Sequence, residues 1–305
     1  MVSCSSGNSI YTKIFAVQAL GSLFAGGSAK NIMGKVVLRR SSRLSGNKTT
    51  VALAKKKTVR SKKTIKGSNA VKMREEERSR VREGYRMVAG TDEAGRGPLA
   101  GPVVAACCYV PLELNESWVD KIADSKALPE PARDELYKEL TSHPEVVWST
   151  GMADAQEIDE VNILQASMLS MHRAVEGMKN HPDYVLVDGN RLPWGHVEAV
   201  RPNGTIRKAD PPKPKGLKEC SAVVKGDAKV FCIAAASIIA KVTRDKMMYD
   251  YDKQYPQYLL GKNKGYPTAE HMAAVSKHGP SPIHRLTFAP LKHMNLKKKA
   301  GNKKK

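Results

Sequence analysis

The sequence has no long hydrophobic run, since none of its apolar stretches approaches the roughly 20 residues that a membrane-spanning helix needs. We therefore expect no membrane partner. Cysteine is also scarce: the five present are Cys4, Cys107, Cys108, Cys220 and Cys232, and no two of them form a Cys-x-x-Cys pair. An odd number of unpaired cysteines argues against a disulfide framework and a cysteine zinc site, and it is typical of a reducing compartment.

Acidic residues are missing from both ends of the chain. Residues 1–74 carry 16 Lys and Arg, residues 292–305 carry 7 Lys, and neither segment contains an Asp or Glu. The net charge of +21 therefore comes from the ends, because residues 75–291 hold 28 basic against 30 acidic residues. A basic chain suggests a nucleic-acid binder, but here the positive field belongs to the tails. The balanced middle is long enough to bury a core.

These shifts in composition divide the chain into three segments. We interpret residues 1–85 as a basic, mostly disordered arm, 86–291 as the folded domain and 292–305 as a lysine-rich tail. The Ser-, Lys- and Arg-rich start has the composition of a transit peptide for the mitochondrion or plastid. Three alternatives are a secretory core at Ile14–Gly27, nuclear import through Lys55–Lys57 or the C-terminal lysines, and a solvated arm that binds polyanions weakly.

The spacing of apolar residues predicts strands that are first adjacent and then alternate with helices. We expect strands at 87–92, 103–110, 146–152, 184–188 and 221–225, and helices at 74–86, 129–140, 162–178, 230–251 and 268–278. The Gly/Pro-rich connection between the first two strands favours an antiparallel pair. A polar, proline-rich stretch at 201–218 is expected to be a long surface loop. This order predicts an α/β protein with a mixed sheet covered by helices.

Acidic residues follow three of the predicted strands. Asp92 and Glu93 end the first strand. Asp188 ends the most hydrophobic strand, and Asp227 follows another. Each acid alone is most simply a turn-former, because Asp beside Gly hydrogen-bonds the turning backbone. If the three strands are neighbours, however, four carboxylates meet at one edge of the sheet.

Four close carboxylates repel one another, and divalent cations relieve that repulsion. Ligation by oxygen alone suits Mg²⁺ or Mn²⁺ rather than zinc. Two such ions about 4 Å apart can activate water and stabilise the leaving oxygen of a phosphodiester. The adjoining Gly95-Arg96-Gly97 turn offers backbone N–H groups and a guanidinium to phosphate or sugar, although such a turn alone is more often a hairpin connection. The sequence thus predicts metal-dependent phosphoryl transfer.

Six segments of the chain form a set of motifs in a fixed order. They are Val88–Ala106, which contains Thr-Asp-Glu-Ala-Gly-Arg-Gly-Pro, and then Asp124–Lys126, Val187–Asn190, Lys225–Asp227, Ala235–Asp245 and Lys264–Thr268. Together they resemble the motifs of the ribonuclease HII (type 2 ribonuclease H) family. The resemblance covers about residues 86–291. It implies that this segment is a catalytic domain with a ribonuclease H-like fold, a mixed five-stranded sheet flanked by helices, and a helical C-terminal part.

The resemblance also implies an activity. Such an enzyme is a metal-dependent endonuclease that cuts the RNA strand of RNA–DNA hybrids and incises duplex DNA 5′ of an embedded ribonucleotide, leaving 3′-hydroxyl and 5′-phosphate ends. It would remove RNA primers and misincorporated ribonucleotides in DNA replication and ribonucleotide excision repair. The likeness to single-chain members implies a monomer. The alternatives are a catalytically inactive hybrid-binding protein, which the intact acids disfavour, and a different two-metal nuclease on the same fold.

Residue by residue, the resemblance implies that the catalytic, metal-binding acids are Asp92, Glu93, Asp188 and Asp227, with Asp245 as the alternative for the fourth. It implies a substrate-binding set in which Gly95, Arg96 and Gly97 recognise the 2′-hydroxyl, Tyr266 packs on the adjoining deoxyribose, and Lys126 and Lys241 lie near the nucleic-acid backbone. Tyr266 could instead fill a turn, and Lys241 could form only an ion pair with Asp245.

The histidines His271, His278 and His284 are not spaced as a metal site. We interpret them as structural, with product release assisted by His278 or His284 as the alternative.

The chain departs from the family pattern between Asp188 and Asp227. This segment is longer than in relatives that share the Asp-Gly-Asn-Arg motif, and the surplus lies in Arg191–Glu219. The basic residues there include Arg201, Arg207, Lys208, Lys213, Lys215 and Lys218. We hypothesise that this stretch adds phosphate contacts beside the active site.

Overall fold

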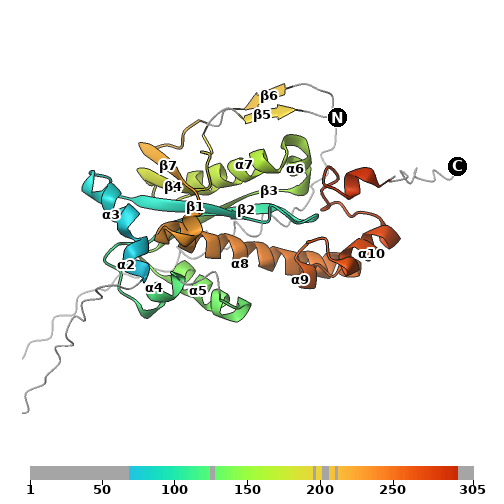
Figure 1. Ribbon diagram of the computed structural model, residues 1–305, viewed down its shortest axis with the longest axis horizontal. Helices are drawn as coiled ribbons and strands as arrows, with labels where there is room; N and C mark the ends of the chain where they lie inside the picture. The colour runs from blue at the N-terminus through green and yellow to red at the C-terminus, as the bar shows by residue number, and fades with distance from the viewer. Residues whose placement is uncertain (1–68, 124–127, 195–196, 201–205, 210–211, 295–305) are drawn as a thin grey trace, which may run out of the picture. The chain divides into compact units, whose positions relative to one another are not determined.

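The computed structural model describes residues 69–123, 128–194, 197–200, 206–209 and 212–294 (Figure 1). Its main sheet has five strands in the order β3-β2-β1-β4-β7. These strands are β1 (Val88–Ala94), β2 (Val103–Tyr109), β3 (Val147–Ala153), β4 (Tyr184–Asp188) and β7 (Glu219–Val223). The pairs β1–β2 and β2–β3 are antiparallel, whereas β1–β4 and β4–β7 are parallel. The predicted mixed sheet and its antiparallel first pair are confirmed.

Helices cover both faces of this sheet (Figure 1). The long helix α8 (Phe231–Gln254) lies on one face with α2 (Asn69–Met73), α4 (Ser117–Ile122) and α5 (Glu130–Ser142). On the other face lie α6 (Ala155–Val161) and α7 (Ile163–Glu176). Strand β2 is apolar toward both layers, since Ala106 and Cys108 pack with α8 while Ala105 and Cys107 pack with α7. The methionines Met168 and Met171 of α7 are buried in the core.

The close approach of α8 to β1 depends on small residues. A Cβ at Gly90 would collide with the backbone of Cys232 in the first turn of α8. The neighbouring Ala234–Ala236 are also small and are buried. This contact fixes α8 against the strand that carries Asp92 and Glu93.

The C-terminal part is helical, as expected, and it shares a hydrophobic core with α8 and the β1–β2 connection. It contains η3 (Pro256–Tyr258), α9 (Leu260–Asn263), α10 (Ala269–His278) and η4 (Leu291–His293). This core includes Leu99 and Ala100 from the β1–β2 connection, together with Met248 of α8. Thr268 is the N-cap of α10, because its hydroxyl accepts a hydrogen bond from the N–H of His271. The connection after β1 is therefore packed against the C-terminal part.

The prediction of one long surface loop over 201–218 is wrong. Instead, β5 (Val197–Val200) and β6 (Ile206–Ala209) form an antiparallel two-stranded sheet. The sequence does carry a hairpin signal there, Asn203-Gly204 between two short β-branched segments, which the charged and proline-rich surroundings obscured.

The position of Lys218 does not support our hypothesis that the basic stretch contacts phosphate beside the active site. Its Nζ lies 3.3 Å from Oδ2 of Asp183, which directly precedes β4. Because β4 and β7 are parallel, the starts of both strands lie at the sheet edge opposite Asp188. Arg201, as well as the side chains of Arg207 and Lys208, lie outside what the structure describes.

The folded part begins before residue 86. Ala70 and Met73 of α2 are buried in the core, and α3 (Glu75–Arg82) follows directly. Glu77 of α3 is buried, and its Oε1 accepts a hydrogen bond of 2.7 Å from the N–H of Cys232. Glu77 thus accepts a bond from one of the otherwise unpaired N–H groups in the first turn of α8 and acts as a tertiary cap for this helix. The predicted targeting segment before residue 69 and the tail from residue 295 lie outside the described residues.

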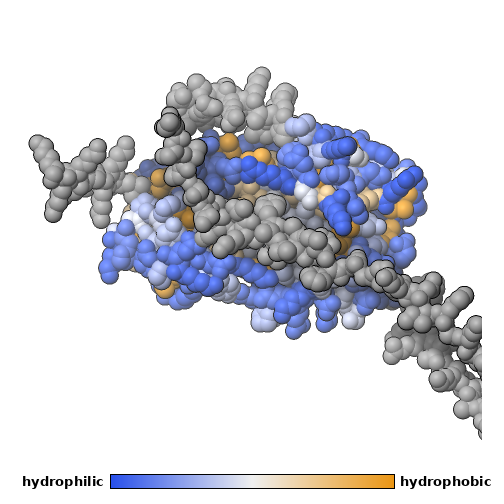
Figure 2. All heavy atoms as spheres, turned by 180° about the vertical axis from the view of Figure 1, so that it is seen from behind, coloured by the Kyte–Doolittle hydropathy of each residue, from blue (hydrophilic) through white to orange (hydrophobic). Residues whose placement is uncertain are grey.

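The described surface is mainly hydrophilic when viewed from behind, and apolar side chains show there only in small patches (Figure 2). Within the described ranges, no helix combines the length and apolar character needed to span a bilayer. The four described cysteines are free.

The buried Glu77 predicts a pH-dependent stability. Burial raises its pKa from 4.5 to about 7, against the opposing effects of Arg74 and the Cys232 N–H. The folded state therefore holds this proton more tightly than the unfolded chain does, so stability is lost as the pH rises from about 4.5 through about 7. We expect Glu77→Gln to remove this loss, which amounts to about 3 kcal/mol of unfolding free energy.

Urea unfolding of the metal-free protein between pH 4.5 and 8 measures this effect. Glu75→Gln in the exposed part of the same helix is the matched control, and it should leave the slope unchanged. Parallel profiles for wild type and Glu77→Gln would show that Glu77 does not titrate in this range.

Candidate active site

Three of the predicted acids meet at one edge of the sheet. The parallel register pairs Thr91 of β1 with Val187 of β4, so Asp92 and Asp188 come next on neighbouring strands. Asp227 lies in η2 (Gly226–Ala228), shortly after β7. Its N–H is 3.4 Å from Oδ1 of Asp188, which also accepts a bond of 2.6 Å from the N–H of Gly226. The strand order therefore places Asp92, Asp188 and Asp227 at the same edge of the sheet.

The first two acids are buried among like charges. Burial raises the pKa of Asp92 well above its usual value, and the charges of Glu93 and Asp188 add to this effect against a hydrogen bond from Ser237 of α8. Burial also raises the pKa of Glu93; Arg96 opposes this shift and Asp188 reinforces it. Each carboxyl is therefore harder to ionise here than in water, which is the electrostatic situation that a bound cation reverses.

The donor set fits a hard divalent cation. Its members are carboxylates from neighbouring elements, and Oε2 of Glu93 is buried with no hydrogen-bond partner among the described residues. Among those same residues, no three Asp, Glu, His or Cys side chains are already gathered closely enough to form a metal site. Glu93 is instead paired with Arg96 at 3.1 Å, and Asp188 is bonded to the η2 backbone. An ion at this edge would compete with Arg96 for the Glu93 carboxylate, while the N–H of Gly226 can continue to orient Asp188.

The Gly95–Gly97 turn lies beside Tyr266. Gly95 has φ of +96°, a conformation that side-chain-bearing residues rarely adopt, and a Cβ there would collide with the Arg244 side chain. A Cβ at Gly97 would lie 3.5 Å from Cε1 of Tyr266. Tyr266 is 44% exposed and thus accessible to a ligand. The structure brings the turn and the tyrosine together, although they are far apart in sequence.

Sequence reasoning missed two buried arginines that hold this turn and its continuation. Arg244 of α8 donates from Nε to Pro102 O at 3.0 Å, and from Nη2 to Ala100 O at 3.2 Å and Lys264 O at 3.1 Å. Arg285 binds the same connection from the C-terminal part. An available signal was that Arg244 falls within a predicted helix rich in small apolar residues, where a charged side chain needs buried partners.

Lys241 and Asp245 form the ion pair that their spacing allows, with Nζ 2.8 Å from Oδ1. Of the two candidates for the fourth acid, Asp227 thus lies beside Asp188, whereas Asp245 is paired with a lysine. Lys126 lies outside the described residues.

The histidines are part of the C-terminal packing. His271 and His284 are buried and their Nε2 atoms are 3.1 Å apart, while Nδ1 of His271 is 2.9 Å from the backbone oxygen of Tyr266. Burial, with the neighbouring His271, lowers the pKa of His284 to about 4, so this ring is neutral at physiological pH. These contacts agree with a structural role for the pair; His278 is exposed.

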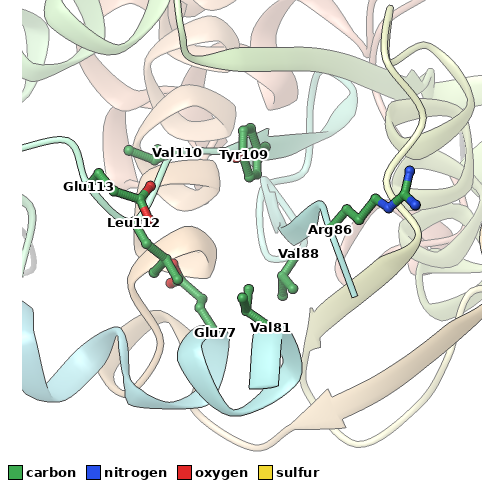
Figure 3. A pocket seen from close by; sticks show the side chains of 8 residues that line it. All are labelled: Glu77, Val81, Arg86, Val88, Tyr109, Val110, Leu112 and Glu113. Atoms are coloured by element: carbon green, nitrogen blue, oxygen red, sulfur yellow. The ribbon is translucent and has the colours of Figure 1, made fainter. Parts of the chain in front are cut away.

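A cavity in the described part of the chain lies away from the acids. Its lining includes Glu77, Val88, Tyr109 and Glu113 (Figure 3). Val88 begins β1, whereas Asp92 and Glu93 lie toward the other end of that strand. The cavity therefore does not belong to the carboxylate site.

The sheet order, the helices on both faces and the acids at the strand ends define a nuclease of the ribonuclease H-like fold. The ribonuclease HII family model matches residues 89–291. This chain belongs to the ribonuclease HII family. It is accordingly a ribonuclease H, an endonuclease that acts on RNA–DNA hybrids.

Known relatives agree in sequence and in fold. Ribonuclease HII of Endomicrobium trichonymphae is 45% identical over 216 residues, which are 70% of this chain and 91% of the relative. Ribonuclease HII of Aliivibrio salmonicida is 45% identical over 212 residues, 70% of this chain and 90% of the relative. The crystal structure of ribonuclease H2 from Pyrococcus horikoshii OT3 is 27% identical with a TM-score of 0.51, and covers 68% of this chain and 96% of that one.

Proposed function

We propose that this ribonuclease H uses divalent metal ions held by Asp92, Glu93, Asp188 and Asp227 to cleave the RNA strand of hybrids. We propose further that it incises duplex DNA 5′ of a single embedded ribonucleotide, leaving a 3′-hydroxyl and a 5′-phosphate. The observation that carries this proposal is the set of acids at one sheet edge, two of them buried with raised pKa, next to the Gly95–Gly97 turn.

The carboxylates would hold Mg²⁺ or Mn²⁺, which as bound ions supply water activation and stabilisation of the leaving oxygen. The rest of the protein holds these carboxylates in position. The N–H of Gly226 orients the Asp188 carboxylate, and α8 buries Asp92 beside it. Burial excludes water and makes electrostatic interactions at this edge stronger than they would be in solvent.

The turn and the tyrosine would select the ribonucleotide. Backbone N–H groups of Gly95–Gly97 can bond the 2′-hydroxyl, while the exposed ring of Tyr266 packs on the adjoining deoxyribose. A deoxyribonucleotide at the same position leaves these donors without a partner. Sites that read a hydroxyl in this way reject the analogue without it by large factors. Lys241 and Lys126 would contact the nucleic-acid backbone nearby.

Metal dependence is tested on a labelled RNA–DNA hybrid with the full chain. After treatment with EDTA and removal of the chelator, we expect no cleavage until Mg²⁺ or Mn²⁺ is added. Extension of the product by a polymerase reports the 3′-hydroxyl, and ligation reports the 5′-phosphate. Cleavage that persists in excess EDTA would reject the metal mechanism, and tight binding without cleavage under every condition would favour the inactive hybrid-binding alternative.

A further inference from the structure

One buried side chain, from near the C-terminal end of the described chain, forms hydrogen bonds with the connection after β1. Arg285 is fully buried, and its guanidinium binds three carbonyls of this connection. Nη2 donates to Gly95 O at 2.7 Å and Nη1 donates to Arg96 O at 3.0 Å. Nε and Nη2 also donate to Gly101 O, at 3.0 and 2.8 Å.

These bonds fix the direction of two peptide planes. In a planar trans peptide, the C=O of one residue points opposite to the N–H of the next. With Gly95 O and Arg96 O turned onto Arg285, the N–H groups of Arg96 and Gly97 point away from that buried guanidinium. Among the described residues, neither N–H has a hydrogen-bond partner. Both residues are exposed, so their N–H groups can bond an external acceptor, and Gly97 lies beside Tyr266.

Arg285 is itself held from both sides. Its own N–H donates to Leu99 O at 2.8 Å, which ties its backbone to the same connection. Immediately after it, the N–H groups of Leu286 and Thr287 donate to the Asp159 carboxylate at 2.7 and 3.0 Å. Burial, with the nearby charge of Arg244, lowers the pKa of Arg285 to about 9, so the guanidinium is still charged at neutral pH.

We propose that Arg285 is a positioning residue for ribonucleotide recognition, which aims the N–H groups of Arg96 and Gly97 at the 2′-hydroxyl of the substrate, with Asp159 fixing the segment that carries it. This inference rests on the proposed function. It makes Arg285 responsible for discrimination between ribose and deoxyribose rather than for overall affinity, since the guanidinium is fully buried and is bonded to carbonyls of the turn.

The test measures binding of two duplexes by the full chain, with Ca²⁺ in place of Mg²⁺ to avoid turnover. One DNA duplex holds a single ribonucleotide and its twin is all DNA. The readout is the ratio of the two dissociation constants. Arg285→Lys keeps the charge but loses the planar fork, and we expect the ratio to fall about tenfold while affinity for the all-DNA duplex changes less than about twofold.

Arg173→Lys is the matched control. Arg173 also donates to a backbone oxygen, that of Met152, and pairs with Glu157, away from the turn. We expect it to leave the ratio unchanged. If Arg285→Lys lost only packing, the affinities for both duplexes would fall together and the ratio of the dissociation constants would be unchanged.

If circular dichroism shows that Arg285→Lys does not fold, a second variant tests the positioning role of Arg285. Asp159→Ala loosens the segment around Leu286 and Thr287 without touching the core, and it should lower the ratio by about two- to threefold, the weaker effect expected of an indirect contact. An unchanged ratio in folded Arg285→Lys, or in Asp159→Ala when the first variant is unfolded, overturns the proposal. A wild-type ratio near one instead rejects the proposed ribonucleotide recognition itself.

Discussion

Asparagine at Asp92 or Asp188 should lower the turnover of an RNA–DNA hybrid by about 10³-fold or more. The substitution keeps the size of the side chain but removes the negative charge that would hold a metal ion. Loss of several kcal/mol of transition-state stabilisation corresponds to a rate effect of this order. Single-turnover cleavage in saturating Mg²⁺ measures the effect. Substantial residual activity in both variants would remove these residues from the metal site.

Although Asp92→Asn should lose turnover, it should not lose stability. Because burial and the charges of Glu93 and Asp188 raise the pKa of Asp92, its ionised form is costly in the metal-free fold. We therefore expect Asp92→Asn to unfold at the same temperature as wild type or higher, measured in EDTA at neutral pH.

Asp183→Asn is the matched control. Burial raises the pKa of Asp183, but hydrogen bonds from the N–H groups of Met87 and Arg86, with Lys218, outweigh it and leave the pKa lowered. Asp183 precedes β4 at the edge opposite Asp188, so this variant should lose stability and keep its turnover.

Alanine at Gly95 should both destabilise the protein, by about 3 kcal/mol, and reduce incision at a single ribonucleotide about 100-fold. The positive φ alone costs about 1–2 kcal/mol for a residue with a side chain. The added methyl group also collides with Arg244, and overpacking of this kind costs about 1–3 kcal/mol. Moving Arg244 disturbs the connection that carries the turn. Chemical unfolding and incision kinetics measure the two effects.

Alanine substitutions at two other glycines distinguish the backbone cost from the steric effect at the turn. Gly84 has nearly the same φ, +98°, but a methyl group added there would meet no atom within 4 Å, so Gly84→Ala should show the backbone cost alone and keep full activity. Gly97→Ala places its methyl in ordinary contact with Tyr266, so stability should be retained while ribonucleotide selectivity falls. Equal losses of activity in Gly84→Ala and Gly95→Ala would show that the turn has no special role.

The sequence predicted those parts of the fold that depend on local pattern. Alternating or continuous apolar runs marked β1 and β4, and acids directly after strands indicated a shared edge because parallel neighbours end together.

What the sequence did not predict depends on contacts between distant segments. Arg285 lies 190 positions from Gly95, and nothing local indicates that its guanidinium will be buried against that carbonyl. Glu77 looks like one more charge on a polar helix, yet it caps α8 from 155 positions away. A buried charge is stable only with its partners, and those partners become visible only once the chain is folded.

The most direct test of this account is cleavage of a labelled DNA duplex that holds one ribonucleotide, beside its all-DNA twin, with Mg²⁺ or Mn²⁺ and with EDTA. We expect a metal-dependent nick 5′ of the ribonucleotide and no cleavage of the twin. Cutting of a continuous RNA–DNA hybrid without any nick at the single ribonucleotide would contradict recognition through the Gly95–Gly97 turn and Tyr266. Equal cutting of both duplexes would show that the site does not read the 2′-hydroxyl.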